Sequence, residues 1–124
     1  MRIAALAAFA GLTLSACTST TQTASVEAGY EPGALAVSAI GRSDWRVAES
    51  NLDEMRGVKA DDPARLINLG TVYMETGRTG EALLAWQRAL GAKNHYMVET
   101  IGGRTMSTDQ LAREALSRYV VASR

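Results

Sequence analysis

The sequence predicts a mostly α-helical protein: a short array of helical hairpins with a small β-hairpin and a C-terminal helix that caps the array. Three observations support this fold class. Apolar residues recur at spacings of three and four, Asp and Gly residues separate the apolar segments, and only residues 95–106 have the glycine turn of a β-hairpin. The 124 residues are 47% hydrophobic with 2 prolines, which suits one globular domain.

Charge balance and the rarity of reactive side chains argue against several function classes. Lys+Arg and Asp+Glu both number 13, so no basic field favours nucleic acid as a partner. The single Cys excludes an intramolecular disulfide and any multi-cysteine metal site, and the single His leaves no obvious zinc cluster. The sequence therefore predicts a protein that is not an enzyme, with no catalytic residue, no cofactor and no metal.

The first seventeen residues contain a targeting signal. Arg2 precedes an apolar run over residues 3–14, which at about 12 residues is too short to cross the roughly 30 Å hydrocarbon core of a membrane. Leu14-Ser15-Ala16-Cys17 follows and resembles the bacterial lipobox, in which small residues precede the cysteine that receives the lipid. The resemblance implies a lipoprotein signal peptide over residues 1–16 and lipidation of Cys17. An ordinary secretory peptide is the alternative.

The segment after the lipobox predicts a tether and a location. Residues 17–29 contain the lipidated Cys and a Ser/Thr-rich stretch without apolar periodicity, which is typical of a flexible linker. Several acyl chains would anchor the mature protein stably in a membrane. Thr18 rather than Asp follows Cys17, and the resemblance to enterobacterial lipoproteins then favours the outer membrane of the cell envelope, facing the periplasm. The folded domain is expected over residues 30–124.

The first two helices of this domain are predicted from residues that begin or end helices and from the spacing of apolar residues. Pro32 suits the first turn of a short helix that ends before Gly41. Asp44 is expected to cap a second helix, which ends before Gly57. The apolar positions of that second helix are Trp45, Ala48, Leu52 and Met55.

Two further helices form the best-defined pair. Asp62-Pro63 combines a cap with a first-turn proline, and the helix that it opens is expected to stop at Gly77 in the left-handed conformation. Thr79 is expected to cap the following helix. Because Gly77-Arg78 is a very short connection, the two helices must pack antiparallel as a hairpin.

This hairpin has a distinctive set of core positions: Leu66, Leu69, Gly70, Tyr73, Ala82, Trp86 and Ala89. The set resembles a tetratricopeptide repeat (TPR) over residues 63–96, in which Gly70 and Ala82 are small where the helices approach most closely. About 34 residues upstream, Ala48 and Leu52 correspond to Ala82 and Trp86, so residues 41–62 resemble the second half of a degenerate preceding repeat. An unrelated helical bundle is the alternative.

The C-terminal part departs from the repeat. Residues 95–106 predict a β-hairpin turning at Gly102-Gly103, and it needs the helices for support because two strands alone are marginally stable. Ser107 and Gln110 predict a capping box for a final helix, which covers the open end of the array. The apolar positions of that helix are Leu111, Ala112, Ala115, Leu116, Tyr119 and Val120.

The TPR resemblance implies a protein-binding scaffold, because stacked hairpins form a groove lined by the first helix of each pair. The expected groove residues are Ala64, Ile67, Asn68, Thr71 and Met74. Ile67 and Met74 are apolar, so they either form an exposed patch or are buried against the preceding repeat. The sequence thus predicts a membrane-anchored adaptor, scaffold or assembly factor for unidentified envelope proteins. The alternatives are a small enzyme or enzyme subunit acting on envelope polymers, and a structural lipoprotein that self-associates as a homodimer.

Candidate catalytic groups have simpler structural explanations. His95 is expected at the surface or at a helix terminus, because no evident Asp partner completes a catalytic triad. Asp61-Asp62 is a carboxylate pair, but helix capping accounts for Asp62. Gly102-Gly103 predicts a turn, since no GxGxxG motif or phosphate-loop lysine accompanies it.

Overall fold

The computed structural model describes residues 29–122. In chain order its elements are α1 (Val37–Gly41), α2 (Trp45–Asp53), α3 (Pro63–Glu75), α4 (Thr79–Leu90), β1 (Met97–Glu99), β2 (Thr105–Ser107) and α5 (Thr108–Ala122). The described chain is mostly helical with one two-stranded antiparallel sheet, which confirms the predicted fold class at this level.

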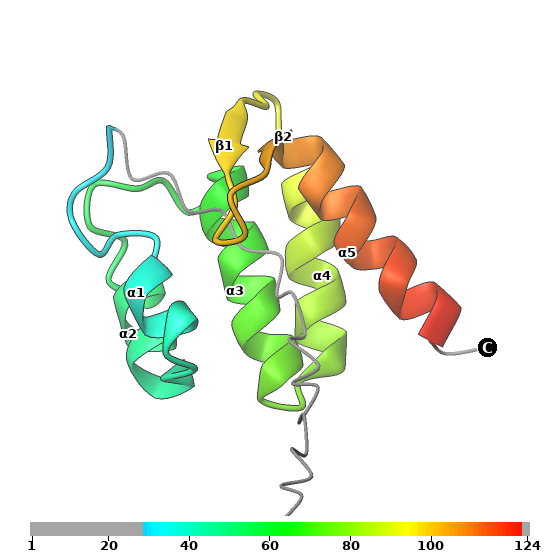
Figure 1. The fold of residues 1–124 in the computed structure, drawn as a ribbon, viewed down its shortest axis with the longest axis horizontal. Helices are drawn as coiled ribbons and strands as arrows, with labels where there is room; N and C mark the ends of the chain where they lie inside the picture. Colours follow the sequence, from blue (N-terminus) through cyan, green and yellow to red (C-terminus); the bar gives the residue numbers. More distant parts are fainter. Residues whose placement is uncertain (1–28, 123–124) are drawn as a thin grey trace, which may run out of the picture.

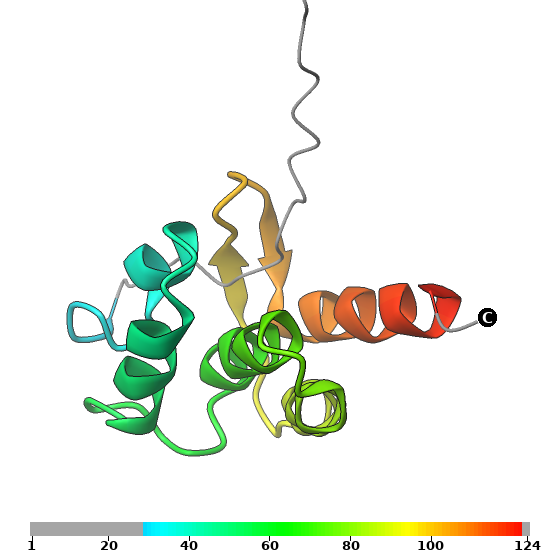
Figure 2. The same cartoon turned by 90° about the horizontal axis from the view of Figure 1, so that it is seen from below.

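The antiparallel pair α3–α4 forms the centre of the molecule (Figure 1). The short helices α1 and α2 lie on one side, where α2 packs on α3. On the other side α5 packs on α4 and also contacts α3. Figure 2 shows the β1–β2 ribbon standing between the α1–α2 pair and α5, beside α3. Three separate parts of the chain therefore surround α3.

Capping side chains set the starts of the longer helices. Asp44 accepts a hydrogen bond from the Val47 amide at 3.3 Å, and Asp62 accepts one from the Arg65 amide at 3.1 Å. Both predicted caps are confirmed. At the end of α3, Gly77 has a φ of 80°, as predicted for a left-handed residue that stops a helix.

Two local predictions are wrong. Thr79 is the first residue of α4 rather than its cap, and Arg78 occupies the cap position without a side-chain hydrogen bond. The first helix begins only at Val37, so Pro32 lies before it in a turn. Ala36 has a φ of 57°, and this left-handed residue prevents a helix from running through from Pro32 to Gly41.

The ribbon is closed by a glycine turn and joined to α5 by a cap. β1 and β2 pair Val98 with Met106, and both side chains are buried. Gly103 has a φ of 79° in the connecting turn. The Ser107 amide donates to Gln110 Oε1 at 3.2 Å, which is one half of the predicted capping box.

Two arginines tie α2 to the central pair. Arg65 of α3 is buried, and its Nε donates to the Leu52 carbonyl at 2.8 Å. Arg78 donates to both carboxylate oxygens of Glu49, at 2.8 and 2.7 Å, and its guanidinium lies 4.4 Å from the centre of the Tyr73 ring. The hydrogen bond from Arg78 lowers the pKa of Glu49. These contacts fix α2 against both ends of α3.

Candidate functional site

The five predicted groove residues lie on α3, but four of them are buried. Ile67 is 1% exposed and Asn68 is 0% exposed, and Ala64 and Thr71 are buried as well. Met74, near the end of the helix, is half-buried. The prediction of an open groove at these residues is therefore wrong, because other parts of the chain fill the space in front of α3.

The segment before α1, residues 30–36, covers part of this face of α3. We call this segment the strap. Its Leu35 side chain is fully buried and packs in one apolar cluster with Ala64 and Ile67 of α3. The Asn68 side-chain amide donates to the Leu35 carbonyl at 2.8 Å. The predicted groove residue Asn68 thus binds a backbone carbonyl of its own chain.

The ribbon and α5 cover the rest of this face of α3. Val98 of β1 and Met106 of β2 belong to the same buried cluster as Leu35 and Ile67. Leu111 of α5 joins them. The preceding helices α1 and α2 instead pack on another flank of α3, around Leu69 and Val72, in a second cluster. Burial of Ile67 therefore comes mainly from the strap, the ribbon and α5, and not from residues 41–62, the segment that the sequence suggested as a preceding repeat.

The other face of α3 meets α4 at a very close approach. A Cβ at Gly70 would come within 2.4 Å of Trp86 Nε1, so only glycine fits there without a shift. The Trp86 indole N–H donates to the Ile67 carbonyl at 3.2 Å. The other proposed core residues are buried at Leu66, Leu69, Ala82 and Ala89, and half-buried at Tyr73. This face is a packed helix–helix contact.

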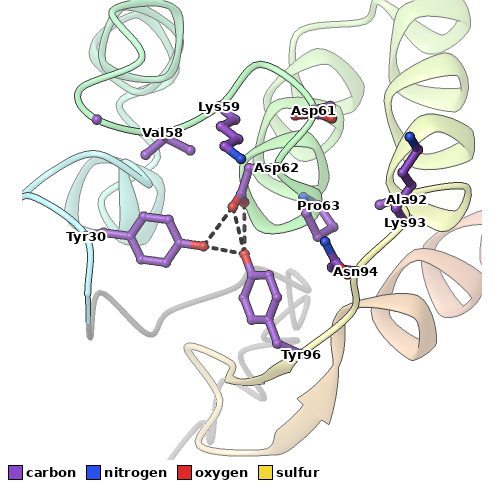
Figure 3. Close-up of a pocket in the computed structure, with 11 residues that line it drawn as sticks. Tyr30, Val58, Lys59, Asp61, Asp62, Pro63, Ala92, Lys93, Asn94 and Tyr96 are labelled. Atoms are coloured by element: carbon purple, nitrogen blue, oxygen red, sulfur yellow. Dashed lines mark hydrogen bonds between the residues drawn. The ribbon is translucent and has the colours of Figure 1, made fainter.

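A polar cluster fastens the start of the strap. Tyr30 and Tyr96 come from different segments and point their hydroxyl groups toward Asp62 (Figure 3). The Tyr30 hydroxyl donates to Asp62 Oδ2 at 2.9 Å, and the Tyr96 hydroxyl donates to Asp62 Oδ1 at 2.9 Å. The two hydroxyl oxygens also contact each other, and because each phenol has a single proton, a hydroxyl that donates to the other hydroxyl does not donate to Asp62 at the same time. We call this cluster the tyrosine latch, and it joins the strap to the cap of α3 and to the segment before β1.

Both latch tyrosines remain protonated well above neutral pH. Burial raises the pKa of Tyr30 to about 12, and hydrogen bonding to Asp62 acts in the same direction. Burial also raises the pKa of Tyr96, with further increases from its hydrogen bonds to Tyr30 and Asp62. The two phenols therefore act as hydrogen-bond donors toward the Asp62 carboxylate.

An open cleft of about 470 Å³ lies beside the latch. Its charged lining is balanced, with Lys59 and Asp61 from the α2–α3 loop, Asp62 at the cap of α3 and Lys93 after α4. The Lys59, Asp61 and Lys93 side chains are exposed and form no hydrogen bond or ion pair with residues 29–122. The cleft is open to solvent and is lined by charges of both signs.

The lone histidine joins two helix ends. His95 Nε2 lies 3.2 Å from the Leu90 carbonyl at the end of α4, and Nδ1 lies 3.0 Å from the Thr108 hydroxyl at the start of α5. A carbonyl can only accept, so Nε2 donates to Leu90, and in the neutral imidazole Nδ1 then accepts from the Thr108 hydroxyl. As predicted, His95 is an exposed residue at a helix terminus, and both of its ring nitrogens have structural partners.

Sequence reasoning missed the strap and the latch. Tyr30 lies 32 residues before Asp62 and 66 before Tyr96, so no local spacing indicates that these side chains meet. Leu35 falls within the short helix that was expected from Pro32 to Gly41, and it instead packs in a turn against α3 and the ribbon. The local signal in this segment is a leucine between two alanines, directly after Gly33.

The comparisons with known proteins identify no relative. No protein-family model matches the chain, and neither a curated protein nor a solved structure matches it. Within residues 29–122 no helix is long and apolar enough to cross a membrane, and no group of three His, Cys, Asp or Glu side chains could hold a metal ion. Cys17 and the predicted signal peptide lie outside the described residues.

Proposed function

We propose that this chain is a lipid-anchored protein–protein interaction module of the bacterial cell envelope, built on a TPR-like helical array. The anchor rests on the lipobox resemblance at Leu14-Ser15-Ala16-Cys17 and on the Ser/Thr-rich tether after it. The proposal places the module at the outer membrane, facing the periplasm, where it would act as an adaptor, scaffold or assembly factor.

One observation carries the TPR-like part of the proposal. Ala48 and Leu52 of α2 are fully buried, and so is Ala82 of α4, while Trp86 is 6% exposed. These two pairs lie about one 34-residue repeat unit apart in the chain. Equivalent positions of successive hairpins therefore point into the interior, as expected when repeats stack.

The pattern of packing also supports an array. The helix α2 packs on α3, α3 packs on α4, and α4 packs on α5, so contacts run mainly between neighbours. Such quasi-linear stacks serve as binding scaffolds because they present large surfaces on a rigid frame. Exposed apolar side chains on α4, the ribbon and α5 are candidate contact points for a partner protein. They are Leu84, Met97, Ile101 and Val120.

The experiment follows the anchor and the partner in the same cells. Wild-type protein and the Cys17→Ser variant are labelled with a radioactive fatty acid, and photo-crosslinking amino acids are placed at Leu84 and Met97. We expect lipid labelling, membrane fractionation and a discrete crosslinked protein for the wild type. The Cys17→Ser variant should take up no lipid, and should remain unprocessed or be released from the membrane.

Three results would contradict the proposal. Normal mature mass and membrane fractionation of the Cys17→Ser variant would contradict the lipid anchor. Absence of any crosslinked protein at Leu84, Met97 and further surface positions would contradict the adaptor function. Turnover of an envelope polymer by the purified protein would favour the enzyme alternative.

A further inference from the structure

The turn between β1 and β2 presents one large apolar side chain to solvent. Figure 2 shows the ribbon standing clear of the helices, with its turn pointing away from the α3–α4 pair. Ile101 in this turn is 44% exposed and is followed by Gly102 and Gly103, which have no side chains to shield it. Turns are built mainly from Gly, Pro, Asn, Asp and Ser, so an exposed isoleucine at this position calls for a physical reason.

Three hydrogen bonds within the turn pair its backbone groups. The Thr100 amide donates to the Arg104 carbonyl at 2.8 Å, and the Gly103 amide donates to the Thr100 carbonyl at 2.8 Å. The buried Thr100 side chain accepts a third bond, from the Arg104 amide to its hydroxyl at 3.1 Å. Backbone groups that enter an apolar medium need such internal partners, because an unpaired N–H or C=O is costly there. The turn therefore keeps these bonds when water around it is replaced by lipid.

Two charged residues flank Ile101 and limit how far the turn can enter a bilayer. Glu99 at the end of β1 and Arg104 before β2 are both exposed, and their charges cancel. Arg104 also forms an ion pair with Glu114 of α5, with 3.2 Å between Nη2 and Oε1. Charged side chains are expensive in hydrocarbon and stay at the level of the headgroups. This arrangement allows the insertion of one side chain, that of Ile101, and no net charge attracts the turn to anionic lipid.

The predicted lipid anchor joins the domain close to the ribbon. Tyr30 contacts Tyr96 in the tyrosine latch, and β1 begins directly after Tyr96. Cys17 lies 13 positions before Tyr30, so the chain between them spans at most about 45 Å when fully extended. Ile101 lies five positions after Tyr96, at most about 18 Å from it. A lipid on Cys17 would therefore hold the bilayer within reach of the turn at all times.

We propose that the ribbon turn is a second membrane contact of the anchored domain, in which Ile101 inserts between the headgroups of the bilayer that holds the Cys17 lipid. One apolar side chain would not recruit a soluble protein to a membrane. Here the contact is intramolecular once the lipid is in place, and the high effective concentration of the bilayer makes a weak contact sufficient. This inference rests on the lipid anchor of the proposed function.

The second contact would orient the domain. The helix α4 lies on the side of the domain away from the ribbon turn (Figure 2). Docking through the turn would therefore hold α4, with its exposed Leu84, away from the bilayer and toward the periplasm. A lipid anchor on a tether fixes the distance of a domain from a membrane, whereas an anchor and an inserted turn together also fix which face a partner protein meets.

The test measures which part of the anchored domain touches acyl chains. Cys17 is the only cysteine, and lipidation consumes its thiol, so an introduced cysteine can be labelled specifically with a fluorophore. Thr105→Cys places the label on exposed β2 beside the turn, and Leu84→Cys places it on α4 as the matched reference. The lipidated proteins are reconstituted into phosphatidylcholine vesicles whose acyl chains contain bromine, a quencher. We expect the Thr105 label to lose fluorescence and the Leu84 label to keep it.

Substitution of Ile101 shows whether its side chain causes the contact. Ile101→Ser removes the apolar side chain and should lower the ratio of docked to undocked molecules about tenfold, seen as a loss of quenching at the Thr105 label. Met97→Ser is the matched control, because Met97 is 58% exposed at the other end of the ribbon and should not affect the quenching. Thermal melts check that both variants are folded.

Several results would overturn the proposal. An unquenched Thr105 label, equal quenching at Thr105 and Leu84, or quenching that persists in Ile101→Ser would each do so. The comparison of the two labels keeps the proposal testable even if Ile101→Ser does not fold. A photo-crosslinking amino acid at Ile101 that captures one discrete protein and no lipid in intact cells would assign the turn to a partner protein instead.

Failure of this inference can be told apart from failure of the proposed function. If only the docking of the turn fails, Cys17 still takes up lipid and the crosslinked protein at Leu84 persists, while the Thr105 label stays unquenched. If the lipid anchor itself fails, Cys17 takes up no fatty acid in cells, whatever the labels report in vesicles.

Discussion

The two faces of α3 are built in different ways. The face toward α4 is a direct helix contact, in which Gly70 lies against Trp86 within a single hairpin. A second face, around Ile67 and Asn68, is covered by the strap and by the continuous segment of the ribbon and α5, which are two widely separated parts of the chain. The face toward α4 is buried by contacts within one hairpin. The face around Ile67 is buried only when segments that are distant in the chain come together as the whole domain folds. Substitutions on each face test this difference.

The largest effect is expected from a charge on the strap face. Ile67→Glu loses about 1.5–3 kcal/mol of apolar burial and leaves an uncompensated buried charge, which costs about 3–5 kcal/mol. Together these approach the whole stability of a small domain. Chemical denaturation at neutral pH should therefore find the variant largely unfolded.

The same variant should respond to pH in a defined direction. Burial would raise the folded-state pKa of the introduced carboxyl above its ordinary value of about 4.3. The folded state then holds its proton more tightly, so stability is retained below about pH 4.3 and is lost as pH rises. Met74→Glu, at a half-buried position on the same helix, is the matched control and should change stability by less than about 1 kcal/mol. Equal melts for both variants would mean that the strap face is open in solution.

Trp86→Ala should have the next largest effect, on the face toward α4. Trp86 is 6% exposed and donates its indole N–H to the Ile67 carbonyl, so truncation removes a large buried side chain and a hydrogen bond. Replacing a buried tryptophan by alanine costs about 3–5 kcal/mol. Leu84→Ala, on the same helix at 61% exposure, should stay within about 0.5 kcal/mol of the wild type in the same denaturation series. A loss as large at Leu84 as at Trp86 would contradict the described packing of α4.

The contrast between the two faces also explains which features the sequence could predict. The caps at Asp44 and Asp62, the stop at Gly77 and the close approach at Gly70 depend on residues within a few turns of each other, so spacing indicates them. The cover over Ile67 depends on Leu35, 32 residues upstream. No periodic pattern in the sequence indicates that Leu35 packs against Ile67. The groove prediction failed for this reason. A repeat pattern specifies which residues face outward from a hairpin, but it does not specify what packs against them.

Gly70→Ala should change the stability by a smaller amount. A loss of stability would show that overpacking against Trp86 outweighs the higher helix propensity of alanine, and a gain would show the reverse. Alanine favours a helix over glycine by about 1 kcal/mol, but the added Cβ would lie 2.4 Å from Trp86 Nε1. The indole ring is rigid, so α3 and α4 must separate, and overpacking of this kind costs about 1–3 kcal/mol. We expect a net loss in the thermal melt. Gly80→Ala is the matched control in α4, where a Cβ would meet nothing within 4 Å, and it should raise stability instead.

The smallest effect is expected at the tyrosine latch, which fastens the strap without filling the core. Tyr30→Phe removes one hydroxyl that donates to Asp62 and should cost about 0.5–1.5 kcal/mol, as for a typical hydrogen bond. Because burial raises the pKa of Tyr30 from 10.0 to about 12, the folded state keeps the phenol proton longer than the unfolded state. The contribution of Tyr30 is therefore complete below pH 10 and is lost as pH rises toward 12. The wild type should lose stability over this interval more steeply than Tyr30→Phe, as measured by denaturation in matched buffers. Identical slopes would mean that Tyr30 is not held at Asp62, and that the strap is attached to α3 through Leu35 and Asn68 alone.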